Sequence, residues 1–254
     1  MRFLDCDPAS GSCQVSHSGH STAQTARHFS GEVTVKYIGD PMCSWCWGIS
    51  PALEELARYC EQKQIGFTLT MGGLRAGGGD PWVPAFQAFL RQEWTHVAKV
   101  TGQPFGFSLL AAKYFDYDTE PACRAVVIAE QISAQQGLVA SATLAFFSAV
   151  QRKFYVEGED PKDVSFYRSI CEDASISFDE FRSRFTTAAA QSAVYEQFTQ
   201  CQAWGVRSFP TLLLEVGGDL KQLNSGATTA AATIARIEHL MSTGENSHVA
   251  PREI

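Results

Sequence analysis

The segment that most constrains this chain spans residues 40–48, DPMCSWCWG, where Cys43 and Cys46 enclose two residues. The segment follows an alternating strand pattern over 33–38 and precedes a helical pattern over 49–60. At such a junction the first sulfur lies over the helix N-terminus, where unpaired N–H groups and the helix macrodipole favour a thiolate. A zinc ribbon or finger needs a second Cys or His pair, and no such pair follows residue 46. The pattern therefore predicts dithiol–disulfide exchange and no metal site.

Two further features strengthen this interpretation. Pro51 lies within the predicted helix, where it removes a backbone donor and should kink the helix. Residues 43–56 resemble the active-site helix of thioredoxin-fold proteins. Much later, residues 205–214, GVRSFPTLLL, resemble the segment that carries the cis-proline opposite the cysteines in the same superfamily, with Pro210 in that position.

The rest of the chain has two kinds of pattern. Strand signals cover 32–38 and 66–72, so the helix between them makes a βαβ unit with a parallel pair. The glycine-rich run 72–79 lacks a Gly-Lys-Ser/Thr ending and follows a second strand, which favours an exit loop over a phosphate site. From about 80 to 203 the apolar residues recur at helical spacing. A hairpin over 211–223 and a helix over 228–241 follow.

This order, β-α-β, an all-helical insertion and then β-β-α, predicts an α/β protein with a thioredoxin fold interrupted by a large helical insertion. The arrangement over about 31–242 resembles the DsbA-type oxidoreductases, particularly their branch of predicted protein-disulfide isomerases. We expect the following division: a flexible tail over 1–30, the first part of the thioredoxin fold over 31–79, the insertion over 80–190, the second part over 191–242, and a tail over 243–254.

The resemblance implies a thiol–disulfide oxidoreductase in which Cys43 is the exposed nucleophile and Cys46 is the resolving thiol. Geometry agrees, since only the first sulfur can sit at the mouth of the helix. Cys43 would attack a substrate disulfide, and Cys46 would then displace the mixed disulfide.

The predicted substrate site lies around Pro210. Proline presents no N–H, so the backbone at Ser208 and Phe209 could pair with an extended substrate strand near the sulfurs. Trp45, Trp47 and Phe209 would supply an apolar contact for an unfolded chain. Alternatively, Trp45 is an ordinary surface residue between the cysteines and has no role in substrate binding.

Two residues near the cysteines bear on the direction of transfer. Many thioredoxin-like proteins carry a buried acid six residues before the first cysteine, and Tyr37 stands there instead. Asp40 is close to Cys43, and its charge would oppose the thiolate. We therefore expect a Cys43 pKa below the free value of about 8.5 and well above the roughly 3.5 of the strongest oxidant. This favours a reductase or isomerase over a dedicated oxidase.

Composition excludes several classes of binding partner. A net charge of −7 and a pI near 5.4 argue against nucleic acid and anionic membranes as partners. No apolar run approaches the roughly 20 residues of a transmembrane helix, and the first 30 residues lack the apolar segment of a secretory signal. We expect a cytoplasmic protein without a cofactor that exchanges with protein or peptide thiols and disulfides. Glutathione and a thioredoxin-type reductant are both candidate recycling partners, and the sequence does not choose between them.

The N-terminal stretch holds a second cysteine pair, Cys6 and Cys13, around the turn signals Asp-Pro and Ser-Gly. His17 and His20 follow. Low hydrophobicity favours a disordered tail with two idle thiols. The alternatives are an auxiliary disulfide or resolving pair, and a metal site, although the spacing fits no standard zinc pattern.

Two other functions compete with the exchanger. Kappa-class glutathione transferases and 2-hydroxychromene-2-carboxylate isomerases resemble this split fold, but they generally hold a single Ser or Cys and have no use for Cys46. A non-enzymatic redox-sensing adaptor is the second, with Cys6 and Cys13 as an additional switch. Turnover of a model disulfide separates the sensor from the enzymes.

Overall fold

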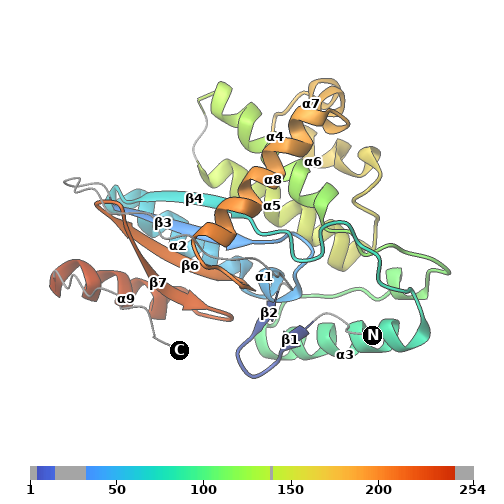
Figure 1. The fold of residues 1–254 in the computed structure, drawn as a ribbon, viewed down its shortest axis with the longest axis horizontal. Helices are drawn as coiled ribbons and strands as arrows, with labels where there is room; N and C mark the ends of the chain where they lie inside the picture. The colour runs from blue at the N-terminus through green and yellow to red at the C-terminus, as the bar shows by residue number, and fades with distance from the viewer. Residues whose placement is uncertain (1–4, 15–32, 138–139, 244–254) are drawn as a thin grey trace.

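The computed structural model describes residues 5–14, 33–137 and 140–243, and its centre is a mixed four-stranded sheet (Figure 1). Its strand order is β4-β3-β6-β7. The central strand β3 (Val33–Gly39) pairs in parallel with β4 (Gly66–Met71) and antiparallel with β6 (Thr211–Val216). β7 (Asp219–Ser225) completes the predicted hairpin with β6. β3 is thus covered on both edges and leads directly into the cysteine segment.

The predicted first helix is divided in two. α1 (Ser44–Gly48) carries the second cysteine of the motif, and α2 (Ser50–Lys63) follows after a break at Ile49. Pro51 occupies the first turn of α2, where its missing N–H needs no helical partner. The proline therefore starts a new helix where the sequence predicted a kink within one helix.

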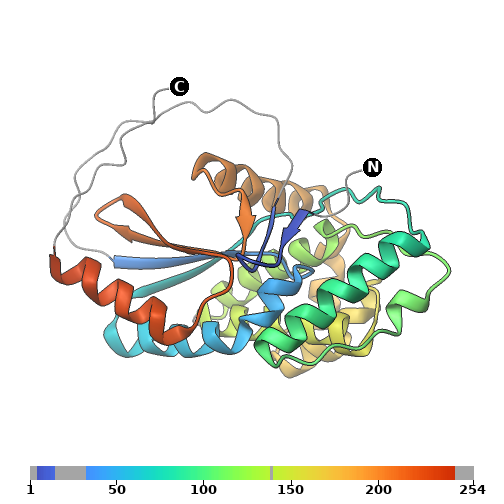
Figure 2. The same ribbon diagram turned by 90° about the horizontal axis from the view of Figure 1, so that it is seen from below.

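Helices cover both faces of the sheet (Figure 2). α2 packs with α9 (Ala230–Thr243) on one face, and α8 (Ala188–Ala203) contacts β4 on the other. Together with the sheet order, this arrangement is a thioredoxin fold, as predicted.

A helical insertion separates β4 from α8 and is built around buried aromatic rings. Ser177 caps one of its helices by accepting a hydrogen bond from the Glu180 backbone N–H at 3.4 Å. α8 begins before the boundary predicted at 191, and the division into parts stays a prediction. The elements of the insertion are α3 (Pro84–Thr101), η1 (Leu109–Ala111), α4 (Glu120–Gln135), α5 (Ala140–Arg152), η2 (Lys153–Glu157), η3 (Val164–Tyr167), α6 (Arg168–Asp173) and α7 (Phe178–Phe185).

The glycine-rich loop after β4 is held by carboxylates. The backbone N–H of Gly77 donates to Asp118 Oδ1 at 2.8 Å, and that of Gly79 donates to Asp116 Oδ1 at 3.1 Å. These N–H groups face negative side chains, an arrangement that repels a phosphate. The loop is an exit into the insertion, as predicted.

The N-terminal stretch departs from its prediction. Residues 5–14 form a hairpin of β1 (Asp5–Asp7) and β2 (Ser12–Gln14), closed by a Cys6–Cys13 disulfide. β2 also pairs with β5 (Ser208–Phe209), which makes a second, three-stranded sheet. The disulfide and the pairing with β5 hold residues 5–14 in place, although their composition predicted a disordered tail. The remaining residues of that prediction, with His17 and His20, lie outside the described residues, as does the predicted C-terminal tail from 244 onward.

None of the helices within the described ranges is both long and apolar enough to cross a membrane.

Candidate active site

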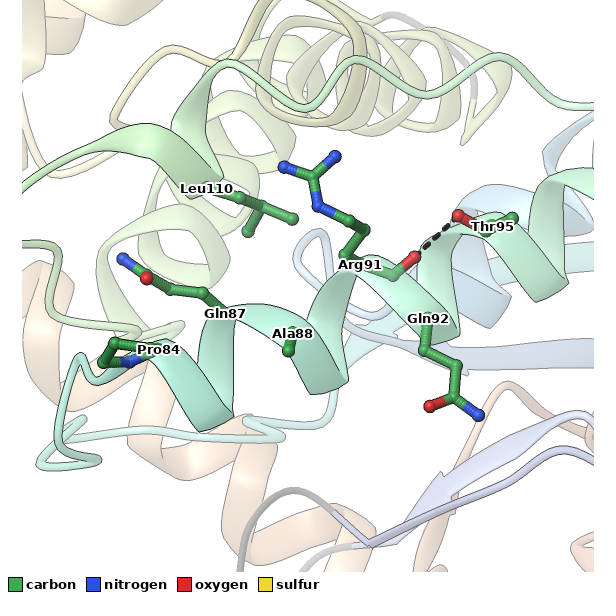
Figure 3. A pocket seen from close by; sticks show the side chains of 7 residues that line it. All are labelled: Pro84, Gln87, Ala88, Arg91, Gln92, Thr95 and Leu110. Carbon is green, nitrogen blue, oxygen red and sulfur yellow. Dashed lines mark hydrogen bonds between the residues drawn. The ribbon is translucent and has the colours of Figure 1, made fainter.

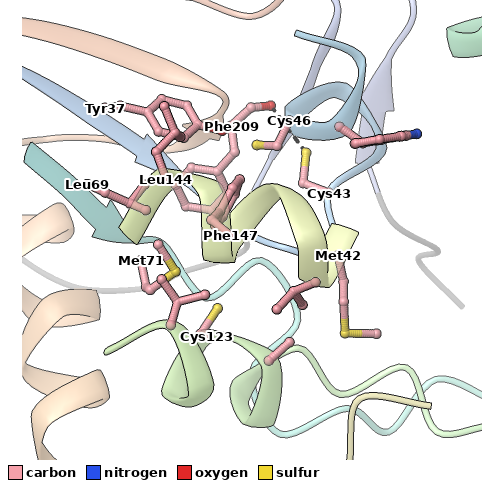
Figure 4. Close-up of a cluster of buried hydrophobic side chains, with 14 of the residues drawn as sticks. Tyr37, Met42, Cys43, Cys46, Leu69, Met71, Cys123, Leu144, Phe147 and Phe209 are labelled. Carbon is pink, nitrogen blue, oxygen red and sulfur yellow. Dashed lines mark hydrogen bonds between the residues drawn. The ribbon is translucent and has the colours of Figure 1, made fainter. Parts of the chain in front are cut away.

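Cys43 and Cys46 meet at the start of α1. Cys43 is the N-cap residue, with φ −91° and ψ 118°, and Cys46 lies within the first turns of the helix. Both are free thiols, and each has 0% of its surface exposed. The Cys43 thiol faces the carbonyl oxygen of Phe209 at 3.7 Å, so the residue before the proline reaches the first sulfur (Figure 4).

The Phe209–Pro210 peptide bond is cis, and the two residues before the proline form β5. Ser208 also shares a hydrogen bond of 2.7 Å between its Oγ and the Oγ of Ser225 in β7. The structure therefore brings Ser208, Phe209 and Pro210 to the cysteines, where the sequence predicted a strand-pairing site. That site is occupied by β2 of the same chain.

Two expectations for Cys43 are contradicted by its burial. The sequence predicted an exposed nucleophile with a lowered pKa. In the structure burial raises the pKa of the Cys43 thiol well above its ordinary value, and the neighbouring Cys46 sulfur and the Asp40 carboxylate act in the same direction. A buried sulfur lacks the solvent that stabilises a thiolate.

Asp40 organises the loops around the cysteines. Its buried carboxylate accepts hydrogen bonds from the backbone N–H of Met42 at 2.8 Å and of Leu74 at 2.7 Å. The Cys123 thiol of α4 donates to the same side chain at 3.3 Å. Burial nevertheless raises the pKa of Asp40. The residue thus ties the segment before α1 to the loop after β4 and to the insertion.

Tyr37 takes the place of the buried acid found in many thioredoxin-like proteins. Its ring is fully buried, and burial followed by the nearby Cys46 sulfur raises the pKa of its phenol. A neutral phenol at this position adds no charge beside the resolving thiol.

The predicted apolar substrate contacts are already used within the protein. Trp47 is 6% exposed and donates from Nε1 to the Pro104 carbonyl at 2.9 Å, so it anchors the loop after α3. The Phe209 ring packs on Gly72, where even a Cβ would come within 2.0 Å of it. Trp45, at 1% exposed, lies beneath the hairpin and against the His96 ring at 5.7 Å. None of the three presents an open surface to an unfolded chain, which corrects that prediction.

Tyr117 positions the residue before Cys43 and was not singled out from the sequence. Its hydroxyl donates to the Met42 carbonyl oxygen at 2.8 Å in a buried environment. A tyrosine in a segment without helical or strand pattern carries no local signal for such a contact, since its partner lies 75 positions away.

We expect Tyr117→Phe to lower the free energy of unfolding by about 1–3 kcal/mol, because it leaves the buried Met42 carbonyl without its donor. Turnover should also fall, since Met42 adjoins Cys43. Tyr167→Phe is the matched control, because the Tyr167 hydroxyl donates to the Pro161 carbonyl at 2.6 Å away from the cysteines. Urea denaturation and disulfide turnover of both variants test this. Equal turnover in the two variants would contradict a positioning role for Tyr117.

Glu93 of α3 is a buried acid near Met42, the residue before Cys43. It is 7% exposed, and burial raises the pKa of its carboxyl, with a smaller opposing effect of His96. A raised pKa in the folded state means that the carboxyl favours folding below about pH 4, the unfolded value, and that this contribution is lost as pH rises through the folded value.

Glu93→Gln is therefore expected to be more stable relative to the natural protein at pH 7 than at pH 4, measured by urea denaturation at both values. A difference in the free energy of unfolding that does not change with pH would contradict this prediction.

A hollow between α3 and η1 lies away from the cysteines. It measures about 470 Å³ and is bordered by α3 and η1 (Figure 3). Two of its polar side chains have partners within the protein: Arg91 lies over the Phe107 ring at 4.9 Å, and Gln87 donates to the Ala112 carbonyl at 3.2 Å. Within the described residues, no cluster of His, Cys, Asp and Glu is arranged to hold a metal ion. The cysteine pair is therefore the candidate site.

Among known proteins, disulfide oxidoreductases have structures similar to this chain. No family model and no curated protein sequence matches the chain. Among solved structures, a candidate protein disulfide isomerase from Nitrosomonas europaea is 30% identical with a TM-score of 0.74, over 85% of this chain and 100% of that one. The cytosolic disulfide reductase DsbM from Pseudomonas aeruginosa is 24% identical with a TM-score of 0.65, over 83% of this chain and 98% of that one.

DsbM has also been solved with glutathione. That structure is 24% identical to this chain with a TM-score of 0.63, over 84% of this chain and 100% of that one.

Proposed function

The chain belongs to the DsbA-type thioredoxin-fold disulfide oxidoreductases, and we propose that it reduces or isomerises protein disulfides through Cys43 and Cys46. The site assignment rests on the junction between the segment after β3 and helix α1, where the two cysteines lie. Cys43 caps α1, Cys46 follows within the helix, and the Phe209 carbonyl faces the Cys43 thiol at 3.7 Å.

The two thiols have unequal roles in this proposal. Cys43, at the helix mouth, attacks a substrate disulfide and forms a mixed disulfide while one substrate thiol leaves. Cys46 then attacks the Cys43 sulfur, which releases the second substrate thiol and forms a Cys43–Cys46 disulfide. The backbone of Ser208 and Phe209 is the proposed pairing site for the substrate strand, which an external substrate would reach by displacing β2.

The direction proposed is reduction or isomerisation. A strong oxidant has a stabilised thiolate at its first cysteine, whereas burial and the Asp40 carboxylate raise the pKa of Cys43. No described Lys or Arg forms an ion pair with Asp40 to offset its charge.

We place the protein in the cytoplasm with glutathione, or a thioredoxin-type protein, as its reductant and no bound cofactor. The fold is shared with a cytosolic reductase that was solved with glutathione. Six of the eight cysteines are free thiols, which suits a reducing compartment. The intact pair also favours an exchanger over a glutathione transferase of the kappa-class type, which would not use Cys46.

The test is turnover of a model protein disulfide with reduced glutathione as the electron donor. We expect catalysed reduction with glutathione disulfide as the product. A rate no greater than that of glutathione alone would contradict the proposal and would favour the redox-sensing adaptor.

A further inference from the structure

We propose that the Cys6–Cys13 disulfide is an intramolecular substrate of Cys43, held by its hairpin in the position of a substrate strand. Electrons would then pass between the two cysteine pairs within one chain. This inference rests on the proposed thiol–disulfide exchange and adds a second redox pair to it.

The register of β2 carries the first step of the argument. β2 pairs antiparallel with β5, so that Cys13 lies opposite Phe209 and Gln14 lies opposite Ser208. The Phe209 carbonyl oxygen is also the group that the Cys43 thiol faces at 3.7 Å. Cys13 and Cys43 therefore meet at the same residue, on the backbone where an external substrate strand would pair.

A shared cavity places the disulfide beside the nucleophile. Cys6 and Cys13 line a hollow of about 10 Å³ together with Met42 and Ser44, the two residues that flank Cys43. A space this small holds at most one water molecule. While β2 is paired with β5, the Cys6–Cys13 disulfide therefore lies next to the residues that flank Cys43.

The tip of the hairpin fits closely against the site. Gly11 has φ +65°, and a Cβ there would come within 2.5 Å of Ala227 Cβ and 3.2 Å of the Trp45 ring. The Ala227 backbone N–H donates to the Ser10 carbonyl oxygen at 3.3 Å. Gly11 of the hairpin therefore lies next to the Trp45 ring, where the sequence predicted contact with an unfolded chain.

Exposure gives the two sulfurs of the hairpin different partners. Cys13 is 1% exposed and Cys43 is fully covered, whereas Cys6 is half-buried. An external thiol or disulfide reaches the pair through Cys6, and the active site reaches it through Cys13. Disulfides in a reducing compartment are usually transient and catalytic or redox-sensing, which fits a disulfide in this position.

The exchange balances without an outside oxidant. The Cys43 thiol loses its proton and attacks Cys13 Sγ; the Cys6–Cys13 bond breaks, and Cys6 leaves and takes up a proton. Cys46 then loses its proton and attacks Cys43 Sγ, which releases Cys13 as a thiol. The products are a Cys43–Cys46 disulfide and two reduced thiols, Cys6 and Cys13, which can reduce an external disulfide.

The decisive experiment uses full-length Cys46→Ser, in which the second step cannot occur. The variant is prepared with the Cys6–Cys13 disulfide formed, then quenched with acid and alkylated, and its disulfides are mapped by mass spectrometry. We expect a Cys13–Cys43 cross-link within monomers, with a yield that does not depend on protein concentration. Tethering supports this, because a tethered partner has an effective concentration on the order of millimolar.

A parallel sample of the same variant with oxidised glutathione separates the two proposals. A Cys43–glutathione adduct without any Cys13–Cys43 cross-link would overturn the intramolecular exchange and leave the proposed function intact. Failure of Cys43 to form either disulfide would overturn both.

Gly11→Ala tests the seat of the hairpin without altering a cysteine. In the Cys46→Ser background we expect it to reduce the yield of the Cys13–Cys43 cross-link severalfold, because the added Cβ collides with Ala227. Gly102→Ala is the matched control, with a similar φ of +78° and no atom within 4 Å of the added Cβ. Equal cross-link yields in the two variants would contradict the proposed seat.

A hairpin that merely blocks the site gives the opposite result in a double variant, Cys6→Ser with Cys13→Ser. Intramolecular exchange predicts slower turnover of a model protein disulfide in this variant. Unchanged or faster turnover would overturn the exchange and identify the hairpin as a simple cover.

Discussion

Replacing Cys46 with serine is expected to reduce turnover of protein disulfides to the uncatalysed rate while Cys43 still forms a mixed disulfide. The first attack needs only Cys43, whereas release of the substrate needs the second thiol. Cys43→Ser should lose both the mixed disulfide and turnover. Turnover is measured with a model protein disulfide and glutathione, and the mixed disulfide by mass spectrometry.

Cys60→Ala is the control for a buried cysteine outside the site. Cys60 lies on α2, is fully covered, and has its pKa raised to about 11 by burial. This variant should retain turnover. Full activity of Cys46→Ser would contradict dithiol exchange and favour a glutathione-dependent enzyme that uses one cysteine.

Phe154→Ala is expected to lower the free energy of unfolding by about 3–5 kcal/mol, the usual loss for a buried phenylalanine. Phe154 lies in the π-helical turn η2 and has no exposed surface. Its ring packs against Trp94 at 5.9 Å, Tyr117 at 5.9 Å and Tyr155 at 4.8 Å between ring centres. Removal would leave a cavity among rings that cannot close it without moving α3.

Urea denaturation measures this loss, and Tyr114→Ala provides the comparison. Tyr114 is 77% exposed, so its removal should change the free energy of unfolding by no more than about 0.5 kcal/mol. A similar loss in both variants would mean that the aromatic cluster contributes little to holding the insertion together. The cluster also includes Tyr117, so Phe154→Ala should slow turnover as well.

The architecture was predictable because its signals are local. Strands β3, β4, β6 and β7 follow apolar alternation and turn residues, and the prediction of a thioredoxin fold with a helical insertion is confirmed. The break at Ile49 was anticipated only as a kink, because Pro51 fits equally well inside a kinked helix and in the first turn of a new one.

The environment of the site depends on contacts between distant segments, and these have no local signal. Composition assigned residues 5–14 to a mobile tail, but pairing of β2 with β5 joins positions far apart in the chain. Cys43 is fully buried beside that pairing, and burial raises its pKa where the sequence predicted a lowered one. Trp47 was assigned to substrate binding for its residue type alone, while its partner Pro104 lies on the insertion.

The reduction potential of the Cys43–Cys46 pair tests the central claim most directly. The protein is equilibrated in glutathione buffers of graded ratio, quenched with acid, and mapped for Cys43–Cys46 and Cys6–Cys13 disulfides by mass spectrometry. We expect a Cys43–Cys46 disulfide with a potential between the about −270 mV of thioredoxin and the about −180 mV of protein disulfide isomerase, below the about −120 mV of the oxidant DsbA, since no stabilised thiolate favours the reduced form. If no Cys43–Cys46 disulfide forms at any ratio, the pair does not exchange electrons and the account is contradicted.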